Sequence, residues 1–321
     1  MAHEIDMTTG QAAVAWGGTV PPWHGLGKPM PEDASIDEWR IAAGLDWEAK
    51  RSTVQFQNGE MRSWDGRDVL YRSDTNAPLS VVSSDYKILQ PAEALSFFKD
   101  LAETADIQIE TAGSLKEGKR IWALGRIDED RVIMDDRIAP YVLMATSYDG
   151  TMATIAKFTS IRVVCSNTLH ASINNEYGKV QVTVPHSTNF DASIVKSMLG
   201  LDYESWNNFA YSANQMAARK LGDTEMDLFL QELLKPSKDA PEPDKIRRSR
   251  GYLRIMDLYK GEQIGGGMDA VNGTAWGAIN AVTQYIDHEK GRTRDTRLTN
   301  AWFGTGARLK NKAFSILREA A

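Results

Sequence analysis

The sequence has few of the residues that build metal centres and disulfide frameworks. Its 321 residues include one cysteine, Cys165, and five histidines. One cysteine cannot form an internal disulfide, and no Cys-x-x-Cys or His-x-x-x-His pair offers zinc-ligand spacing. Asp135, Asp136 and Asp149 suit turns and surfaces better than a magnesium site. We therefore expect no metal site, no other cofactor, and a reducing, cytoplasmic environment.

Long apolar runs are missing as well. No run approaches the roughly 20 apolar residues of a membrane-spanning helix. The first residues, MAHEIDMTTGQAAVAWGG, are acidic where a secretory signal has a basic region. These features predict a cytoplasmic protein that does not associate with membranes.

Signatures of nucleotide-binding loops and of catalytic cysteines are also missing. The segment Gly25–Lys28 lacks the glycine spacing of a P-loop, and Gly265–Gly267 precedes no strand–helix–strand unit. Cys165 follows the mostly apolar run Ile161-Arg-Val-Val, which favours a buried, inert thiol over a nucleophile. We assign no catalytic residue, and the reactivity of Cys165 stays open.

The patterns that are present predict an α+β protein. Apolar and polar residues alternate in several runs between residues 47 and 184, and Asn58-Gly59 and Asp149-Gly150 mark tight turns. Because most of these runs are joined by short turns, we expect a mostly antiparallel sheet with packed helices. A helical period then continues to the C-terminus, which predicts an all-helical C-terminal region.

Helix start signals place several helices. Ser35 and Glu38 have the spacing of a capping box before a helix that ends at Gly44. Pro91 opens a helix over residues 92–105. The triplet Ser166-Asn167-Thr168 supplies cap residues for a helix from Leu169. The segment Lys245–Tyr259 predicts one basic amphipathic helix.

Composition and charge divide the chain into five regions. We expect an N-terminal arm with a short helix (1–44), an α+β body (45–190), a helical region (191–234), a proline-rich linker (235–244) and a basic helical region (245–321). From Lys245 to Ala321 there are 14 basic and 7 acidic residues, a net charge of +7. The remainder, with 23 basic and 36 acidic residues, carries −13. Such a basic quarter can bind an anion, but solvated faces of the C-terminal helices are the simpler explanation.

Basic and aromatic residues suggest a nucleic-acid-binding surface. Arg120, Trp122 and Arg126 share one face of the expected strand at 119–127, where arginines could contact phosphates and the indole could stack on a base. A covered sheet edge is the alternative. The remaining candidates on this surface are Lys157, Arg162, Asn167, Arg247, Arg248 and Arg250.

A second set of residues could line a pocket. Trp23 and His24 lie in a loop rich in glycine and proline, and Tyr148 and Asp149 form a turn. Together with Arg162 they could hold a small ligand. The simpler interpretation is an N-terminal arm fixed by its tryptophans and an ordinary hairpin turn.

Several stretches resemble one family. They are Pro22–Gly27 (PWHGLG), Ala43–Trp47 (AGLDW), Thr111–Leu115 (TAGSL), Arg162–Leu169 (RVVCSNTL), Gly273–Trp276 (GTAW) and Ala281–His288 (AVTQYIDH). The chain is similar to phage/plasmid-like proteins grouped as a prokaryotic domain of unknown function. The resemblance implies a mobile-element protein in a bacterial cytoplasm. The order of elements from Lys119 to Ile173 also resembles single-strand annealing proteins of the Rad52 type.

These features lead to one main hypothesis and two alternatives. The main one is a non-enzymatic phage or plasmid protein that binds single-stranded DNA and anneals strands during recombination, as a homo-oligomer. In the first alternative, the acidic body imitates nucleic acid and binds a host protein in counter-defence. In the second, the chain is an enzyme that takes a nucleotide or small molecule in a pocket near Arg162.

Overall fold

The computed structural model describes residues 4–18, 26–105, 107–127, 130–162, 168–169, 181–199, 203–236, 243–291 and 295–319. The chain forms two compact units. The first consists of Met1–Asp128, Tyr141–Lys157 and Gln181–Leu199, and the second of Glu129–Pro140, Phe158–Val180 and Gly200–Ala321. These units divide the chain differently from the five regions expected from composition, because two segments of the expected α+β body group with the C-terminal helices.

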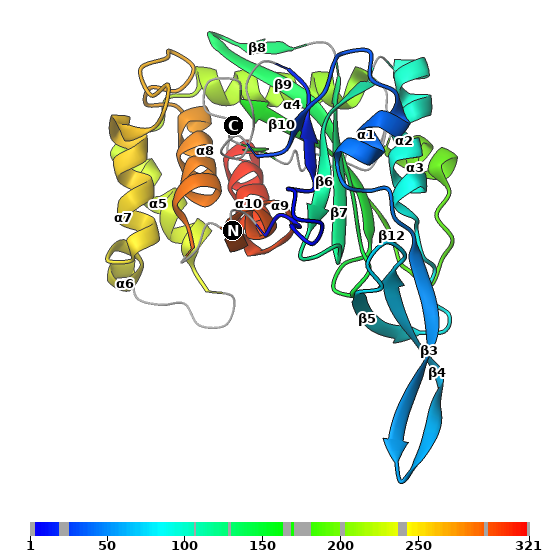
Figure 1. The fold of residues 1–321 in the computed structure, drawn as a ribbon. Helices are drawn as coiled ribbons and strands as arrows, with labels where there is room; N and C mark the ends of the chain where they lie inside the picture. Colours follow the sequence, from blue (N-terminus) through cyan, green and yellow to red (C-terminus); the bar gives the residue numbers. More distant parts are fainter. Residues whose placement is uncertain are drawn as a thin grey trace. The chain divides into compact units, whose positions relative to one another are not determined.

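The main sheet of the first unit contains the long strands predicted from sequence (Figure 1). The antiparallel neighbours β6 and β7 are followed in the sheet by β9 and β10, and on the other side by β1 and β2. Strand β12 pairs antiparallel with the first part of β10. The bounds are β1 (Val14–Trp16), β2 (Lys28–Pro29), β6 (Ile107–Leu115), β7 (Arg120–Ile127), β9 (Asp136–Ser147), β10 (Thr154–Arg162) and β12 (Gln181–Val184).

A second, three-stranded sheet in the first unit contains the predicted hairpin. Strands β3 (Ala49–Asn58) and β4 (Glu60–Arg72) pair antiparallel around Gly59, whose φ of +74° suits glycine in a tight turn. Strand β5 (Pro78–Ser83) pairs with β4 only from Arg67 onward. The hairpin therefore extends beyond β5 as a two-stranded ribbon (Figure 1).

Three helices complete the first unit. The predicted cap of α1 (Ile36–Ala42) is confirmed, because the Ser35 side chain and Glu38 form the reciprocal bonds of a capping box. Helix α2 (Pro91–Ala105) packs against β6 and β7 and buries four large apolar side chains. Gly125 on β7 makes room for this helix, since a Cβ atom there would lie 2.6 Å from Phe98. Helix α3 (Ala192–Leu199) follows β12. The buried side chains of α2 are Leu95, Phe97, Phe98 and Leu101.

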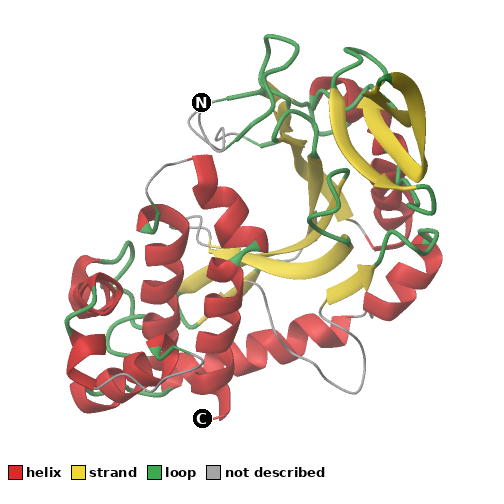
Figure 2. Ribbon diagram, turned by 90° about the horizontal axis from the view of Figure 1, so that it is seen from below, coloured by secondary structure: helices red, strands yellow, loops and turns green. Residues whose placement is uncertain are grey.

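The second unit is built mainly from helices, which Figure 2 colours red, and the apolar α8 contacts α4, α7 and α10. Residues Leu258–Glu262 and Tyr285–Glu289 continue α7 and α8 as π-helical turns. The predicted single helix at 245–259 is wrong, because the Ser249 side chain accepts a hydrogen bond from Tyr252 N and starts a new helix. The helices are α4 (Tyr203–Ala218), α5 (Asp223–Leu234), α6 (Pro243–Arg247), α7 (Arg250–Asp257), α8 (Ala275–Gln284), α9 (Asp295–Phe303) and α10 (Thr305–Glu319).

Two short strand segments also belong to the second unit. Strand β8 (Arg131–Ile133) pairs with the start of β9, and β11 (Thr168–Leu169) pairs with the end of β10. The predicted helix start at residues 168–169 is therefore wrong: backbone pairing with Ser160 and Ile161 outweighs the local cap pattern. The rest of that expected helix lies outside the described residues.

The carboxylates considered for magnesium hold this second unit together instead. Asp135 accepts hydrogen bonds from Asp269 N at 2.8 Å and from Ala270 N at 2.9 Å. Asp136 is buried and accepts one from the Trp276 indole at 2.9 Å. Both carboxylates thus anchor the β8–β9 hairpin on the helices that follow residue 268.

The prediction of an α+β protein, with a mostly antiparallel body and an all-helical C-terminal region, is confirmed. In the described part of the chain, no helix is both long and apolar enough to span a membrane.

Candidate functional site

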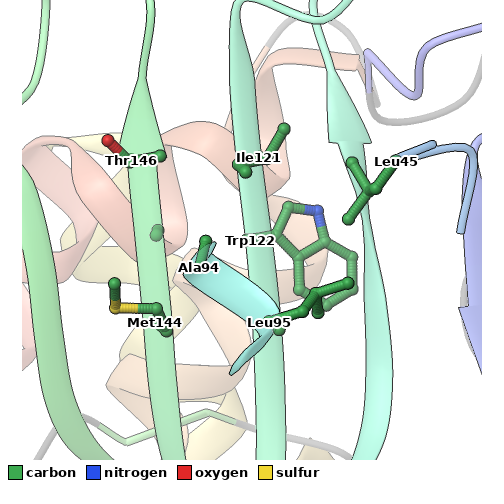
Figure 3. Close-up of a pocket in the computed structure, with 9 residues that line it drawn as sticks. Leu45, Ala94, Leu95, Ile121, Trp122, Met144 and Thr146 are labelled. Carbon is green, nitrogen blue, oxygen red and sulfur yellow. The ribbon is translucent and has the colours of Figure 1, made fainter. Parts of the chain in front are cut away.

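Two of the three residues on the strand face predicted to bind nucleic acid, Arg120 and Trp122, are buried, while Arg126 is partly exposed. Trp122 is 2% exposed, and Figure 3 draws it with Leu45 and Leu95 in the same part of the core. It lines an internal cavity of only about 10 Å³. An indole in this place contributes to the core and presents no face on which a base could stack.

The basic residues of the same expected surface are also engaged inside the first unit. Arg120 is 5% exposed and donates a hydrogen bond to the Thr151 hydroxyl at 3.2 Å. Burial lowers the pKa of Arg120, against the opposing effect of Asp149. Lys157 is buried, and Arg126 lies 3.5 Å from the Glu110 carboxylate. These residues do not form an exposed basic groove.

The residues predicted to line a pocket near the hairpin turn have structural contacts. Tyr148 is fully buried, donates a hydrogen bond to Leu89 O at 2.9 Å and packs edge-on against Trp47. Burial raises the pKa of Tyr148, so its hydroxyl stays protonated. Asp149 accepts hydrogen bonds from the Thr151 amide and hydroxyl and so stabilises the turn. Four predicted site features lie outside the described residues, namely Trp23, His24, the Arg162 side chain and Asn167.

The basic C-terminal segment is divided between two helices of the second unit. Arg247, at the end of α6, binds Asp227 at 2.6 Å and Asp244 at 3.3 Å. The Arg247 and Tyr252 hydrogen bonds hold the pKa of Asp227 well below its usual range. Arg248 is exposed, and so is Arg250. In the most basic stretch of the sequence, Arg247 therefore forms ion pairs within the second unit.

A cavity of about 450 Å³ lies elsewhere in the first unit. None of the residues that line it was predicted to form a site. Its wall is formed by residues 87–89, one side of α2, Thr154 on β10, and residues 184–192 between β12 and α3. The volume falls within the range of small-ligand sites in proteins. Because the wall combines four separate segments of the chain, no single motif marks it.

The charged residues of the cavity wall are two lysines and one glutamate. Lys87 and Lys99 are exposed, and neither forms an ion pair with a described residue. A third ammonium group, that of Lys196 on α3, lies 5.6 Å from the Phe97 ring centroid. The carboxylate in the wall, Glu93, accepts a hydrogen bond from Gln90 N at 2.8 Å and caps α2. Two lysines can therefore receive an anion.

Aromatic side chains form the apolar part of the wall. Phe97 is fully buried, and Phe190 packs edge-on against it with centroids 6.2 Å apart. Phe190 is half-buried and lies beside the exposed polar residues Thr188 and Asn189. The cavity thus combines cations, a partly exposed aromatic ring and uncharged hydrogen-bonding groups.

The His186 side chain connects separate segments around the cavity. Its ring stacks on Tyr86, with centroids 4.3 Å apart. Its Nδ1 lies 3.0 Å from Lys87 O and its Nε2 lies 3.2 Å from Met152 O. Both partners are carbonyl oxygens, so each ring nitrogen faces a hydrogen-bond acceptor. A backbone hydrogen bond from Lys87 N to His186 O also joins these two segments of the wall.

Across the described ranges, no group of three or more His, Cys, Asp and Glu residues is placed to hold a metal ion. The sequence signal that could have found the site is the polar segment Pro185–Phe190, which holds a histidine, an asparagine and a phenylalanine between a strand and a helix. Binding residues often occupy such connections.

Comparison with known proteins adds a family but no activity. No significant match was found among curated proteins or among solved structures. One family model, however, covers more than two thirds of the chain and includes every segment of the cavity wall, while the β3–β4 hairpin precedes the match. With residues 78–306 matched, the chain belongs to the family described as Domain of unknown function (DUF932).

Proposed function

We propose that this chain is a phage or plasmid protein that binds single-stranded nucleic acid, with one nucleotide of the strand seated in the cavity beside Lys87 and His186. The observation that supports this is the combination, in one open cavity, of a partly exposed aromatic ring with Lys87 and Lys99, which form no ion pair with a described residue. Single-stranded nucleic acid is bound by the same combination, since cations contact phosphates and aromatic rings stack on bases.

Each part of the wall has a role in this proposal. Lys87 and Lys99 contact phosphates, and the Phe190 ring stacks on a base. Asn189 and Thr188 form hydrogen bonds with the sugar or the base edge. The wall holds no fixed pair of groups that would select one base, so binding is expected to tolerate any sequence. The chain's net charge of −6 does not oppose this, because the local field governs anion binding.

Strand annealing is part of the same proposal. A protein that holds one strand through its phosphates, with the bases only loosely contacted, leaves them available to a second strand. Annealing then requires several copies along one strand. The expected element order that resembled Rad52-type proteins included a helix from Leu169, where the chain forms strand β11 instead, so the annealing proposal does not rest on that resemblance.

Fluorescence anisotropy with a labelled oligonucleotide tests the proposal. The wild-type chain should bind single-stranded DNA at low salt, and affinity should fall as salt rises. Each phosphate contact on a single strand contributes about 0.7 to the slope of log K against log salt, so Lys87→Ala/Lys99→Ala should reduce the slope by about 1.4. Lys28→Ala, which removes an exposed lysine from β2, is the matched control and should change the slope by less than half as much.

Three outcomes would contradict the proposal at different points. Absence of binding at low salt would remove the nucleic-acid function altogether. Binding with an unchanged salt slope in Lys87→Ala/Lys99→Ala would place the strand elsewhere on the chain. Equal competition by a free mononucleotide and by the oligonucleotide would show that the cavity holds a small molecule, which is the enzyme-like alternative.

A further inference from the structure

The β3–β4 ribbon is an extended element of the first unit, and no described strand pairs with it beyond β5 (Figure 1). Pairing within it runs from Gln55–Ser63 to Asn58–Glu60 at the tip. Strand β5 joins β4 only from Arg67, so the edge of β4 opposite β3 is open from Glu60 to Asp65. A two-stranded ribbon alone is marginally stable in water.

The ribbon also exposes three large apolar side chains. Phe56 is 47% exposed, Met61 65% and Trp64 50%. The Arg67 guanidinium lies 5.6 Å from the centroid of the Trp64 ring. Apolar groups gathered on one projecting element usually mark an interaction surface rather than a solvated one.

The charges of the ribbon indicate which partner fits. Along β4 they alternate as Glu60, Arg62, Asp65 and Arg67, and all four side chains are exposed. None of them forms an ion pair with a described residue. Their sum is zero, which does not suit a polyanion such as nucleic acid.

The same charges are complementary to themselves. When Glu60–Arg67 is aligned antiparallel with a second copy of the segment, Glu60 faces Arg67 and Arg62 faces Asp65, in both directions. Self-complementary contacts of this kind define a twofold interface. The register of β4 against β3 shifts between Ser63 and Asp68, so the segment does not keep the strict face alternation of a regular strand.

We propose that the ribbon binds a second copy of this chain, through antiparallel packing of Glu60–Arg67 against the same segment. The interface joins four ion pairs to the burial of Phe56, Met61 and Trp64. Opposite charges in register fix the alignment, and the apolar side chains supply most of the affinity. This inference does not depend on the nucleic-acid proposal.

Charge reversal of the ribbon provides the test. Arg62→Glu/Arg67→Glu makes the ribbon wholly acidic, and Glu60→Lys/Asp65→Lys makes it wholly basic. The molar mass of the full chain is measured by light scattering after size exclusion, over a series of concentrations. The wild type should form a dimer, each variant alone should be monomeric, and an equimolar mixture of the two should recover the dimer.

The control makes the same change in net charge at another place on the chain. Glu32→Lys/Asp33→Lys alters the net charge as much as Glu60→Lys/Asp65→Lys does, at exposed positions before α1, and should leave the dimer intact. Far-ultraviolet circular dichroism confirms that each variant folds. If either ribbon variant fails to fold, Trp64→Ser with the charges intact replaces it and should weaken dimerisation at least tenfold.

Four results would overturn the inference. They are a wild-type chain that stays monomeric throughout the series, a ribbon variant that dimerises alone, a mixture that remains monomeric, and a control that loses the dimer. Loss of oligonucleotide binding without any change in molar mass would assign the ribbon to nucleic acid instead.

Discussion

The rings of His186 and Tyr86 stack 4.3 Å apart, with their planes 15° from parallel. Tyr86 also donates a hydrogen bond to Ser147 O at 2.6 Å, and its carbonyl accepts one from Arg51 at the base of the ribbon. One short segment before Lys87 therefore connects the cavity wall, the main sheet and the ribbon. Substitutions at His186 or Tyr86 should therefore alter both the stability of the first unit and the shape of the cavity.

Replacing His186 separates these two effects. His186→Ala removes the stack and the hydrogen bonds to Lys87 O and Met152 O, and should destabilise the chain by about 1–3 kcal/mol while weakening oligonucleotide binding. His186→Phe keeps the stack and should recover part of the stability but little of the binding. Urea unfolding and anisotropy measure the two effects. Equal binding by His186→Ala and the wild type would contradict a role for this residue in shaping the cavity.

Substitutions at Trp122 test whether this side chain belongs to the core or to a binding surface. Trp122→Ala should cost about 3–5 kcal/mol, because it leaves a large hole in the core. Trp122→Phe should cost less and should bind oligonucleotide as the wild type does when both are folded. Chemical denaturation gives the first result and anisotropy the second. A folded Trp122→Phe variant with lost binding would restore the strand-face hypothesis.

The Lys310–Asp287 pair in the second unit is fully buried on the lysine side, with 2.6 Å between Nζ and Oδ1. Burial lowers the pKa of Lys310, and Asp287 opposes this effect. Lys310→Met leaves a buried carboxylate behind and should cost about 3–5 kcal/mol. Lys310→Met/Asp287→Leu should recover much of that loss, as measured by urea unfolding. A double variant less stable than Lys310→Met would show that Asp287 has other stabilising contacts.

Acid should weaken the Asp227 network. Its hydrogen bonds to Arg247 and Tyr252 hold the pKa of Asp227 below the unfolded value of about 3.9. As pH falls, the unfolded chain therefore takes up the proton first, and the stability from this group is lost as pH falls through the folded pKa. Asp227→Asn should cost about 1–2 kcal/mol at pH 7 and progressively less in acid. Denaturant midpoints over a pH series measure this; a constant difference across the series would contradict it.

Local patterns predicted much of the secondary structure. The Asn58-Gly59 turn and the Ser35–Glu38 cap depend on residues close in sequence, and both formed as expected. The helix expected from Leu169 did not, because long-range pairing with β10 outweighed the cap pattern. In the same way, Ser249 interrupts an otherwise continuous helical period with a cap of its own.

The candidate site was harder to foresee. Alternation along 120–126 placed two arginines and a tryptophan on one face but could not show that Arg120 and Trp122 are buried in the fold. The cavity wall joins residues as distant as Lys87 and His186, which meet only because β12 pairs with β10. Residue type can suggest a ligand, but which side chains share a cavity depends on the sheet order.

The interleaving of the two units has a consequence for synthesis. The chain leaves the first unit at residue 128, returns to it twice, and completes it only at Leu199. On the ribosome, the first unit therefore cannot close until about two thirds of the protein has been made. The contacts of residues 129–140 form later still, because Asp135 and Asp136 bind backbone and indole groups between residues 269 and 276. No cut at a single peptide bond would release either unit whole.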